Sequence, residues 1–506
     1  MSIPNTLKKQ REYFKSQQTK DVSFRIAILK KLKKEIIERE QDVYDALKKD
    51  FNKSAFETFI SEYGLVISEI NLAIKKLKSW SKPKRVKPSM LTFPSTDYIY
   101  KQPYGTVLVI APWNYPFLLS IEPLIMAIAA GNTVVVKPSE LTKNTSQLVT
   151  NIIKNVFNEK HATSIQGGIP VATELLEQKW DYIFFTGSVP VGRIVAKAAA
   201  KHLTPVTLEL GGKTPCFVDD TINLKLTAKR IVWGKFFNGG QTCISPDYIL
   251  AQAAIKDKLI EALKTEIINA YGENPKQSKD YPRIINKKNT NRLIEMLSNE
   301  NIVFGGEHSV EECYIAPTIV DSPSLEGKLM QDEIFGPILP ILTYENEKDI
   351  DSIINNYDKP LSLYVFSKNK NFTNTIINTY SFGGGATDKF NYAGGTYPGT
   401  QGTCPTDKAI PTTGCTIAIT YDGAVGQGSN TLTVNYARNG AVATQTFLAT
   451  GSTVTSGSVT HTPSSISTTL LSNSSDDGQI VVSNGTATNI TSVTAASSNT
   501  NNVTAQ

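Results

Sequence analysis

Two segments of the chain place a reactive side chain beside glycines at the end of an apolar run. Residues 208–213 (LELGGK) put the carboxylate of Glu209 at the end of a predicted strand, next to two glycines that permit close backbone approach. Residues 237–243 (FNGGQTC) put a thiol directly after a glycine-rich turn. A carboxylate can accept a proton and a thiol can attack an electrophile. A free cysteine is also commonly a buried structural residue, the role that we predict for Cys216 and Cys313.

Three more predicted strands end in residues suited to ligand contact. They are followed by residues 112–116 (PWNYP), 137–140 (KPSE) and 184–188 (FFTGS). Ligands of open parallel sheets bind beyond the carboxyl ends of the strands, so these loops are candidate binding loops. Gly187 and Gly192 form a G-x4-G pair, which fits either a phosphate contact or an ordinary turn. None of the three loops contains the G-x-G-x-x-G fingerprint, so the usual dinucleotide-binding turn is not predicted.

The elements that carry these loops alternate between strand and helix. Residues 105–112 are rich in β-branched side chains, residues 118–131 have the pattern of a helix that ends at a glycine, and residues 132–139 are again β-branched. A second unit of the same kind covers residues 181–212. Strand, helix and strand within about 35 residues predict a parallel sheet covered by helices. The first 385 residues are therefore predicted to have an α/β fold.

The composition of the whole chain excludes several classes of protein. Its 506 residues, 40% apolar and 19% charged, do not fit a disordered or collagen-like chain and are enough for two or three domains. No apolar run reaches the ~18 residues of a membrane-spanning helix, and the N terminus lacks a signal-peptide core, so we expect a cytoplasmic protein. Five cysteines are too few for a disulfide framework, and an evenly spread net charge of +6 argues against nucleic-acid binding.

The composition changes near residues 383–385. The last 121 residues contain eight charged side chains, whereas the first 385 contain 90. Serine, threonine, asparagine and glycine make up about half of this last stretch. Short Thr- and Val-rich runs separated by glycine and asparagine predict antiparallel β structure to about residue 460. Beyond it, disorder and sheet fit the sequence equally well.

Six motifs occur in the order and spacing of the aldehyde dehydrogenase superfamily: TVLVIAPWNYP, VVVKPSE, FFTGS, LELGGK, GQTC and EIFGP. The sequence therefore resembles this superfamily over residues 1–385, and its short N-terminal region is most similar to the class 3, fatty aldehyde type. The resemblance implies NAD(P)-dependent oxidation of a small-molecule aldehyde without a metal. It also implies an NAD(P)-binding domain over residues 81–209, with the helices of residues 1–80 packed on it, and a catalytic domain over residues 210–385.

The resemblance implies three catalytic residues. Cys243 resembles the family nucleophile, whose thiolate attacks the carbonyl carbon of the aldehyde. Asn114 would donate its side-chain amide to the oxygen that becomes an alkoxide, and the backbone N–H of Cys243 would be the second donor of this oxyanion hole. Loss of hydride to the nicotinamide would leave a thioester, and Glu209 resembles the base that activates water to hydrolyse it.

The same resemblance implies the residues that bind NAD or NADP. Lys137 would bind the adenosine ribose, and Glu140 lies close enough in sequence to influence the choice between NAD and NADP. The other matching positions are Gly187, Ser188 and Gly192 at the pyrophosphate, Thr186 and Trp113 at the nicotinamide, and Glu333 and Phe335 at the nicotinamide ribose. The pyrophosphate would lie near a helix N terminus, where free N–H groups favour anions. Trp113 and Phe335 could instead be core aromatics.

The resemblance stops after residue 385, where family members continue through a glycine-rich loop and a final strand of an oligomerisation sheet. Residues 386–506 do not match, and their Cys404–Cys415 loop followed by Thr/Val-rich runs resembles, weakly, pilin-like or other surface β proteins. We predict a truncated catalytic domain, a foreign β-rich or disordered tail, and weakened formation of the family homodimer with reduced activity. The alternative is a non-catalytic surface or assembly protein. In that case the β tail would be the functional part, and the dehydrogenase region would be an inactive relic.

Overall fold

The computed structural model of the chain describes residues 2–381 and, beyond them, eight strands whose bounds are given below. The chain divides into two compact units, residues 1–373 and residues 374–506. Every residue predicted to act in catalysis or cofactor binding belongs to the first unit. The predictions for residues 382–388 and for the run 453–463 lie outside the described residues.

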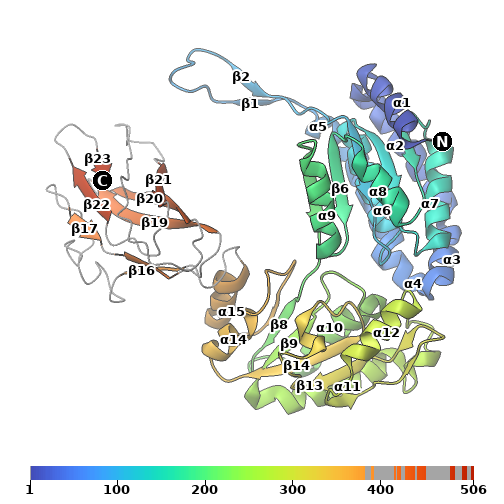
Figure 1. Cartoon of the computed structure of the whole chain (residues 1–506), viewed down its shortest axis with the longest axis vertical. Coiled ribbons are helices and arrows are strands. Elements are labelled where there is room, and N and C mark those ends of the chain that lie inside the picture. Colours follow the sequence, from blue (N-terminus) through green and yellow to red (C-terminus); the bar gives the residue numbers. More distant parts are fainter. Residues whose placement is uncertain are drawn as a thin grey trace. The chain divides into compact units, whose positions relative to one another are not determined.

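A five-stranded parallel sheet is the core of the N-terminal half of the first unit (Figure 1). Its order is β5-β4-β3-β6-β7, with bounds β3 Thr106–Ile110, β4 Thr133–Lys137, β5 Ala162–Ser164, β6 Tyr182–Thr186 and β7 Val206–Glu209. β3 and β4 are buried at every position because helices cover both faces. Val107 and Val109 pack with α6 (Leu118–Ala130) and α7 (Lys143–Val156), whereas Leu108 and Ile110 pack with α1 (Ile3–Lys15), α8 (Ile169–Glu177) and α9 (Val189–Ala200). The predicted strand–helix–strand units are confirmed.

Helices precede this sheet, as the resemblance implies for residues 1–80. α2 (Val22–Glu38), α3 (Glu40–Phe51) and α5 (Gly64–Trp80) join the apolar core that α6 and α7 make with the sheet. Between α4 (Ala55–Thr58) and α5, the turn η2 (Phe59–Tyr63) is π-helical, which the sequence pattern does not predict. β1 (Lys84–Val86) and β2 (Asp97–Ile99) then form an antiparallel hairpin.

The C-terminal half of the first unit is built on a six-stranded sheet of order β10-β13-β14-β9-β8-β15. Its bounds are β8 Pro215–Val218, β9 Tyr248–Gln252, β10 Ile302–Phe304, β13 Thr318–Asp321, β14 Ile338–Tyr344 and β15 Tyr364–Phe366. Neighbouring strands are parallel, apart from the antiparallel pair β10 and β13. α10 (Leu224–Phe236) and α11 (Lys256–Tyr271) share one apolar core with this sheet. The α/β fold predicted for the first 385 residues is confirmed in this half as well.

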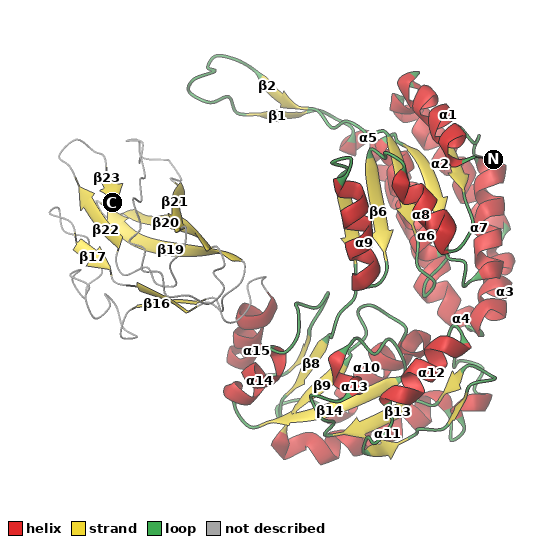
Figure 2. Cartoon of the chain, in the orientation of Figure 1, coloured by secondary structure: helices red, strands yellow, loops and turns green. Residues whose placement is uncertain are grey.

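The remaining elements are helices, two paired strands and short turns, and Figure 2 labels the helices. They are α12 (Lys287–Met296), α13 (Lys328–Gln331), α14 (Glu347–Ile354), α15 (Lys370–Ile376), β11 (His308–Ser309), β12 (Tyr314–Ile315), and the short turns η1 (Gln18–Lys20), η3 (Phe237–Gly240), η4 (Ala253–Ile255), η5 (Pro275–Gln277) and η6 (Ile377–Ser381). Among the described residues, no helix has the length and apolar character needed to cross a membrane.

Beyond residue 388, the described residues of the second unit lie in strands. They are β16 (Lys389–Tyr392), β17 (Cys415–Ile417), β18 (Ile419–Asp422), β19 (Gly428–Arg438), β20 (Ala441–Gly451), β21 (Gln479–Asn484), β22 (Val493–Ser497) and β23 (Val503–Ala505). β16 pairs with β18, β17 with β22, β22 with β23, and β19 with β20, all antiparallel, whereas β20 and β21 are parallel. The nature of the tail as a whole stays a prediction.

Candidate active site

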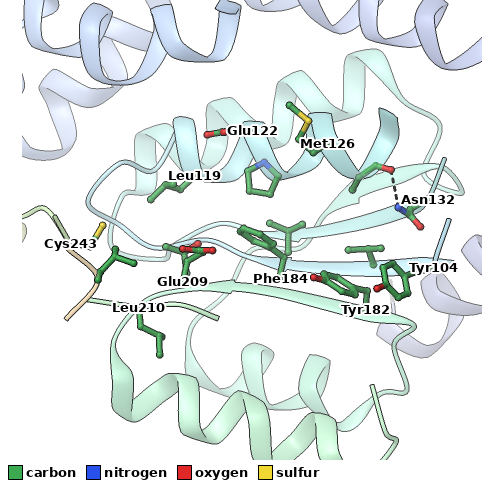
Figure 3. A pocket seen from close by; sticks show the side chains of 16 residues that line it. Tyr104, Leu119, Glu122, Met126, Asn132, Tyr182, Phe184, Glu209, Leu210 and Cys243 are labelled. Carbon is green, nitrogen blue, oxygen red and sulfur yellow. Dashed lines mark hydrogen bonds between the residues drawn. The ribbon is translucent and has the colours of Figure 1, made fainter. Parts of the chain in front are cut away.

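The carboxyl ends of β6 and β7 border a cavity of about 500 Å³. Thr186 and Glu209, the last residues of these strands, line it together with Cys243, which comes from the C-terminal half of the first unit. In Figure 3 the thiol of Cys243 and the carboxylate of Glu209 lie at the same end of the cavity, near Leu119 of α6. The thiol of Cys243 and the carboxylate of Glu209 therefore share one site.

A glycine turn delivers Cys243 to this cavity. Asn238, Gly239 and Gly240 have left-handed φ angles of 54°, 61° and 72°, and they reverse the chain after α10. A Cβ on residue 240 would lie 2.2 Å from the carbonyl oxygen of Gly336. Position 240 therefore requires glycine for two reasons, the sign of φ and the close approach of another backbone.

Asn114 is buried and is tied into the same turn. Its side-chain Nδ2 donates to the backbone carbonyl oxygen of Gln241 at 3.0 Å. The backbone carbonyl oxygen of Asn114 accepts from Nδ2 of Asn238 at 2.8 Å. The next residue, Tyr115, shares a hydrogen bond of 2.5 Å with the hydroxyl of Thr242. Since a primary amide has two N–H groups, Asn114 can hold the turn and still donate to a substrate oxygen.

The carboxylate of Glu333 lies against the glycines that follow Glu209. A Cβ on Gly211 would lie within 2.4 Å of both carboxylate oxygens of Glu333. Burial, and then the charge of Asp247, raise the pKa of Glu333 to about 7. Near neutral pH this group is therefore divided between its charged and its neutral form.

The environment of Cys243 favours the neutral thiol. Burial raises the pKa of Cys243, and the charges of Glu333 and Glu209 raise it further. The backbone N–H groups of Cys243 and Ile244 bond to the sulfur and act in the opposite direction. Loss of the charge on Glu333 would therefore make the thiolate easier to form.

Other side chains, which the motifs do not assign, hold the segment that carries Glu333. Nζ of Lys213 donates to the carboxylate of Asp247 at 2.7 Å and to the carbonyl oxygen of Asp332 at 3.0 Å. Arg292 donates to the carbonyl oxygen of the residue after Glu333 at 2.6 Å. Lys213 is the last residue of the LELGGK motif, and the motif is the sequence signal for it. Asp247 and Arg292 lie outside the motifs, so the sequence gives no signal for them.

The residues predicted to bind the cofactor lie at neighbouring strand ends. Lys137 ends β4, and its Nζ pairs with the carboxylate of Glu140 at 2.5 Å. Ser188 is the N-cap residue of α9, where the first turn of a helix presents free N–H groups to an anion. Gly192, one turn later, is buried, and a Cβ there would lie 2.8 Å from Cδ2 of Leu210. The small size of Gly192 therefore also lets α9 pack on the residue that follows β7.

Trp113 and Phe335 contact each other, with ring centroids 5.2 Å apart at 81°. The contact joins the loop after β3 to the EIFGP motif, although the two segments lie in different halves of the first unit. Both rings are half-buried, so a role in packing and a role beside a ligand stay compatible with their positions.

The comparisons with known proteins agree with this geometry. A model of the aldehyde dehydrogenase family matches residues 2–393. The chain belongs to this family. It is 49% identical over 376 residues to the 4,4'-diaponeurosporen-aldehyde dehydrogenase of Staphylococcus aureus, with 74% of this chain and 82% of that protein covered. It is 44% identical over 374 residues to aldehyde dehydrogenase family 3 member A2 of Pongo abelii, with 74% and 77% covered. The predicted class 3 resemblance is confirmed.

A solved structure has the same fold as this aldehyde dehydrogenase. It is the substrate-bound state of Staphylococcus aureus AldH, which is 48% identical, covers 76% of this chain and 84% of its own, and superposes with a TM-score of 0.74. The chain is therefore an NAD(P)-dependent aldehyde dehydrogenase with the α/β fold of that family, and its cofactor is NAD or NADP. The N-cap of α9 and the glycines beside it fit the pyrophosphate of such a cofactor.

Proposed function

We propose that this enzyme oxidises aldehydes to carboxylic acids through a thiohemiacetal and a thioester on Cys243. The observation that carries the proposal is the shared cavity, which Cys243 and Glu209 line from the two halves of the first unit. A nucleophile and a base on separate, rigid elements can act on one carbonyl carbon in succession. The residue roles that the resemblance implies are compatible with this placement.

The proposed steps use the groups around the glycine turn. The thiolate of Cys243 adds to the carbonyl carbon, and the oxygen that becomes negative accepts hydrogen bonds from Nδ2 of Asn114 and the backbone N–H of Cys243. A bound NAD or NADP, held by the residues named below, would supply the acceptor for the hydride that leaves the carbon as the carbonyl reforms. Glu209 then takes a proton from water, whose oxygen adds to the thioester carbon and displaces the thiolate.

The cofactor would lie across the strand ends that carry the proposed binding residues. Lys137 would contact the adenosine ribose, and its partner Glu140 would influence the choice between NAD and NADP. Gly187, Ser188 and Gly192 would contact the pyrophosphate at the start of α9. The proposed residues at the nicotinamide end are Trp113 and Thr186, together with Glu333 and Phe335 for its ribose. The contact between Trp113 and Phe335 supports the placement of these last residues near one another.

The cavity suits an aldehyde with a long apolar group. From Cys243 it continues between α6 and the sheet to Tyr104 and Tyr182, as Figure 3 shows. Its walls are mainly apolar side chains, which include Val107, Val109, Leu119, Met126 and Phe184. One relative is named for the aldehyde 4,4'-diaponeurosporen-aldehyde. The apolar walls and the class 3 resemblance support medium or long aliphatic and aromatic aldehydes as the proposed substrates.

Exchange of the nucleophile tests the proposal. Cys243→Ala should abolish reduction of NAD and of NADP with a panel of aldehydes, because no thiohemiacetal can form. Cofactor binding, measured by fluorescence titration, should stay within about twofold of the unchanged protein, because the proposed cofactor contacts lie on other loops. Turnover by the Cys243→Ala protein would refute the assigned nucleophile. Absence of turnover by the unchanged protein would favour the alternative of a relic region joined to a working β tail.

A further inference from the structure

One buried side chain, that of Asn238, links the two segments that carry the donors proposed for the oxyanion hole. Nδ2 of Asn238 donates to the carbonyl oxygen of Asn114 at 2.8 Å and to that of Gln241 at 3.2 Å. Nδ2 of Asn114 donates to the same carbonyl oxygen of Gln241 at 3.0 Å. Asn238 therefore fixes Asn114 relative to the turn that ends at Cys243.

Asn238 is in turn held by a carboxylate from a distant part of the chain. Its backbone N–H donates to Oε1 of Glu57 at 2.7 Å, between residues 181 positions apart. Both residues are buried, and Asn238 has a left-handed φ of 54°. This hydrogen bond therefore supports the turn where it needs support, because asparagine tolerates the left-handed conformation but does not enforce it.

A second buried carboxylate, five residues later, holds the other side of the site. Oε2 of Glu62 accepts from the backbone N–H groups of Phe117 and Leu118 at 2.9 and 3.2 Å, directly after the PWNYP loop. Oε1 of Glu62 pairs with the fully buried Nζ of Lys53 at 2.7 Å. The ammonium of Lys53 also lies 4.2 Å from the centre of the Tyr115 ring.

The π-helical turn η2 explains how two carboxylates five positions apart serve one site. In an α-helix, residues five apart point about 140° away from each other, at 3.6 residues per turn. A π-turn closes its hydrogen bond over five residues and so brings such positions toward the same side. Glu57 lies just before this turn and Glu62 within it, and the charge of Glu62 acts directly on Glu57.

We propose that Glu57 is a positioning residue for aldehyde oxidation: through Asn238 it holds Asn114 and the Cys243 turn in the geometry that stabilises the alkoxide, while Glu62 and Lys53 hold the opposite loop. The proposal rests on the function proposed above. It assigns no contact with substrate to Glu57, which acts only through the backbone of Asn238.

The test compares Glu57→Ala with Glu57→Gln in the full chain. Glu57→Ala leaves the Asn238 N–H without its acceptor, and kcat should fall about tenfold. This loss is smaller than the ~10²–10³ known for removal of an oxyanion donor itself, because the donors stay and only their positions loosen. The KM values for aldehyde and cofactor should change less than about twofold, because binding surfaces are not touched. Glu57→Gln keeps an acceptor oxygen and should recover most of kcat.

Alkylation of Cys243 by iodoacetamide separates positioning from general loss of structure. This reaction needs the thiol but no oxyanion hole, so Glu57→Ala should be labelled within about twofold of the unchanged rate. Gln10→Ala is the matched control, because Gln10 is buried and its amide donates to the carbonyl oxygens of Val134 and Glu159 at 2.9 and 3.2 Å, away from the catalytic turn. Its kcat should not change.

Three results would each overturn the inference. The first is an unchanged kcat in Glu57→Ala. The second is a loss of kcat that Glu57→Gln does not recover, and the third is a loss that Gln10→Ala reproduces at equal thermal stability. If Cys243→Ala kept its activity, the proposed function itself would fail, whatever the behaviour of Glu57. The two failures are therefore distinguishable.

Discussion

The negative charges around Cys243 oppose ionisation of its own thiol. A nucleophilic cysteine works as a thiolate, yet burial, Glu333 and Glu209 all favour its neutral form here. Glu333 has a pKa of about 7, so its charge changes in the range where the enzyme would work. Motifs identify these residues, but they cannot reveal this coupling, because Glu333 and Cys243 are 90 positions apart and meet only in the folded chain.

The coupling predicts how alkylation of Cys243 depends on pH. The rate should rise with pH through the raised pKa of the thiol, because only the thiolate reacts. Glu333→Gln removes one negative neighbour, so its rate profile should shift to lower pH. Peptide mapping after iodoacetamide treatment gives the rates, and the fully buried Cys216, whose pKa burial raises strongly, is the internal control that should stay unlabelled. A profile that Glu333→Gln leaves in place would contradict the coupling.

The role of Glu209 predicts a separation of acylation from deacylation. Glu209→Gln should form the thioester but hydrolyse it slowly, because the base that activates water is lost. Stopped-flow absorbance should then show a burst of reduced cofactor near one equivalent per site, followed by slow turnover. A Glu209→Gln protein that binds cofactor but gives no burst would place Glu209 in an earlier step.

At the scale of the element, the turn before Cys243 depends on backbone that cannot carry a side chain. Gly240→Ala would place a Cβ at a left-handed φ and against the carbonyl oxygen of Gly336. The free energy of unfolding should therefore fall by about 1–3 kcal/mol or more. Differential scanning calorimetry should show the lower Tm. Gly234→Ala is the matched control: it lies within α10, a Cβ there meets only ordinary contacts near 3.6 Å, and alanine is the better helix former. Equal losses in both variants would contradict the argument.

The sequence predicts the elements unevenly, for physical reasons. Strand–helix alternation is readable around β3, α6 and β4, because apolar runs and their glycine stops are local signals. The π-turn η2 is not readable, because its five residues have an ordinary helical pattern and what stabilises it is the buried Lys53–Glu62 pair and the loop that Glu62 caps. The same holds for the residues of the candidate site. A single motif indicates Cys243, whereas the hydrogen bond from Asn238 to Glu57 joins residues 181 positions apart and cannot be read from the sequence.

At the scale of the whole molecule, the family match stops long before the chain does. It covers residues 2–393 of 506, and the remaining sequence has a different composition. Replacement of residues 386–506 by a family-type C terminus should raise both kcat and Tm, because it would supply the loop and final strand that the family resemblance expects. Initial-rate kinetics, calorimetry and light scattering on both chains measure activity, stability and dimer formation. The same exchange in a Cys243→Ala background separates stability from catalysis, and no gain in either quantity would contradict the prediction of a truncated catalytic domain.

The origin of the cavity walls has a consequence for any shortened form of this enzyme. Thr186 and Glu209 end strands of the first sheet, whereas Cys243 follows a helix that packs on the second. Neither half, produced alone, would contain a reaction site, even if its own sheet folded completely. A mild perturbation that loosens the packing between the two sheets would likewise abolish dehydrogenase activity, while the circular dichroism spectrum stayed that of the folded protein.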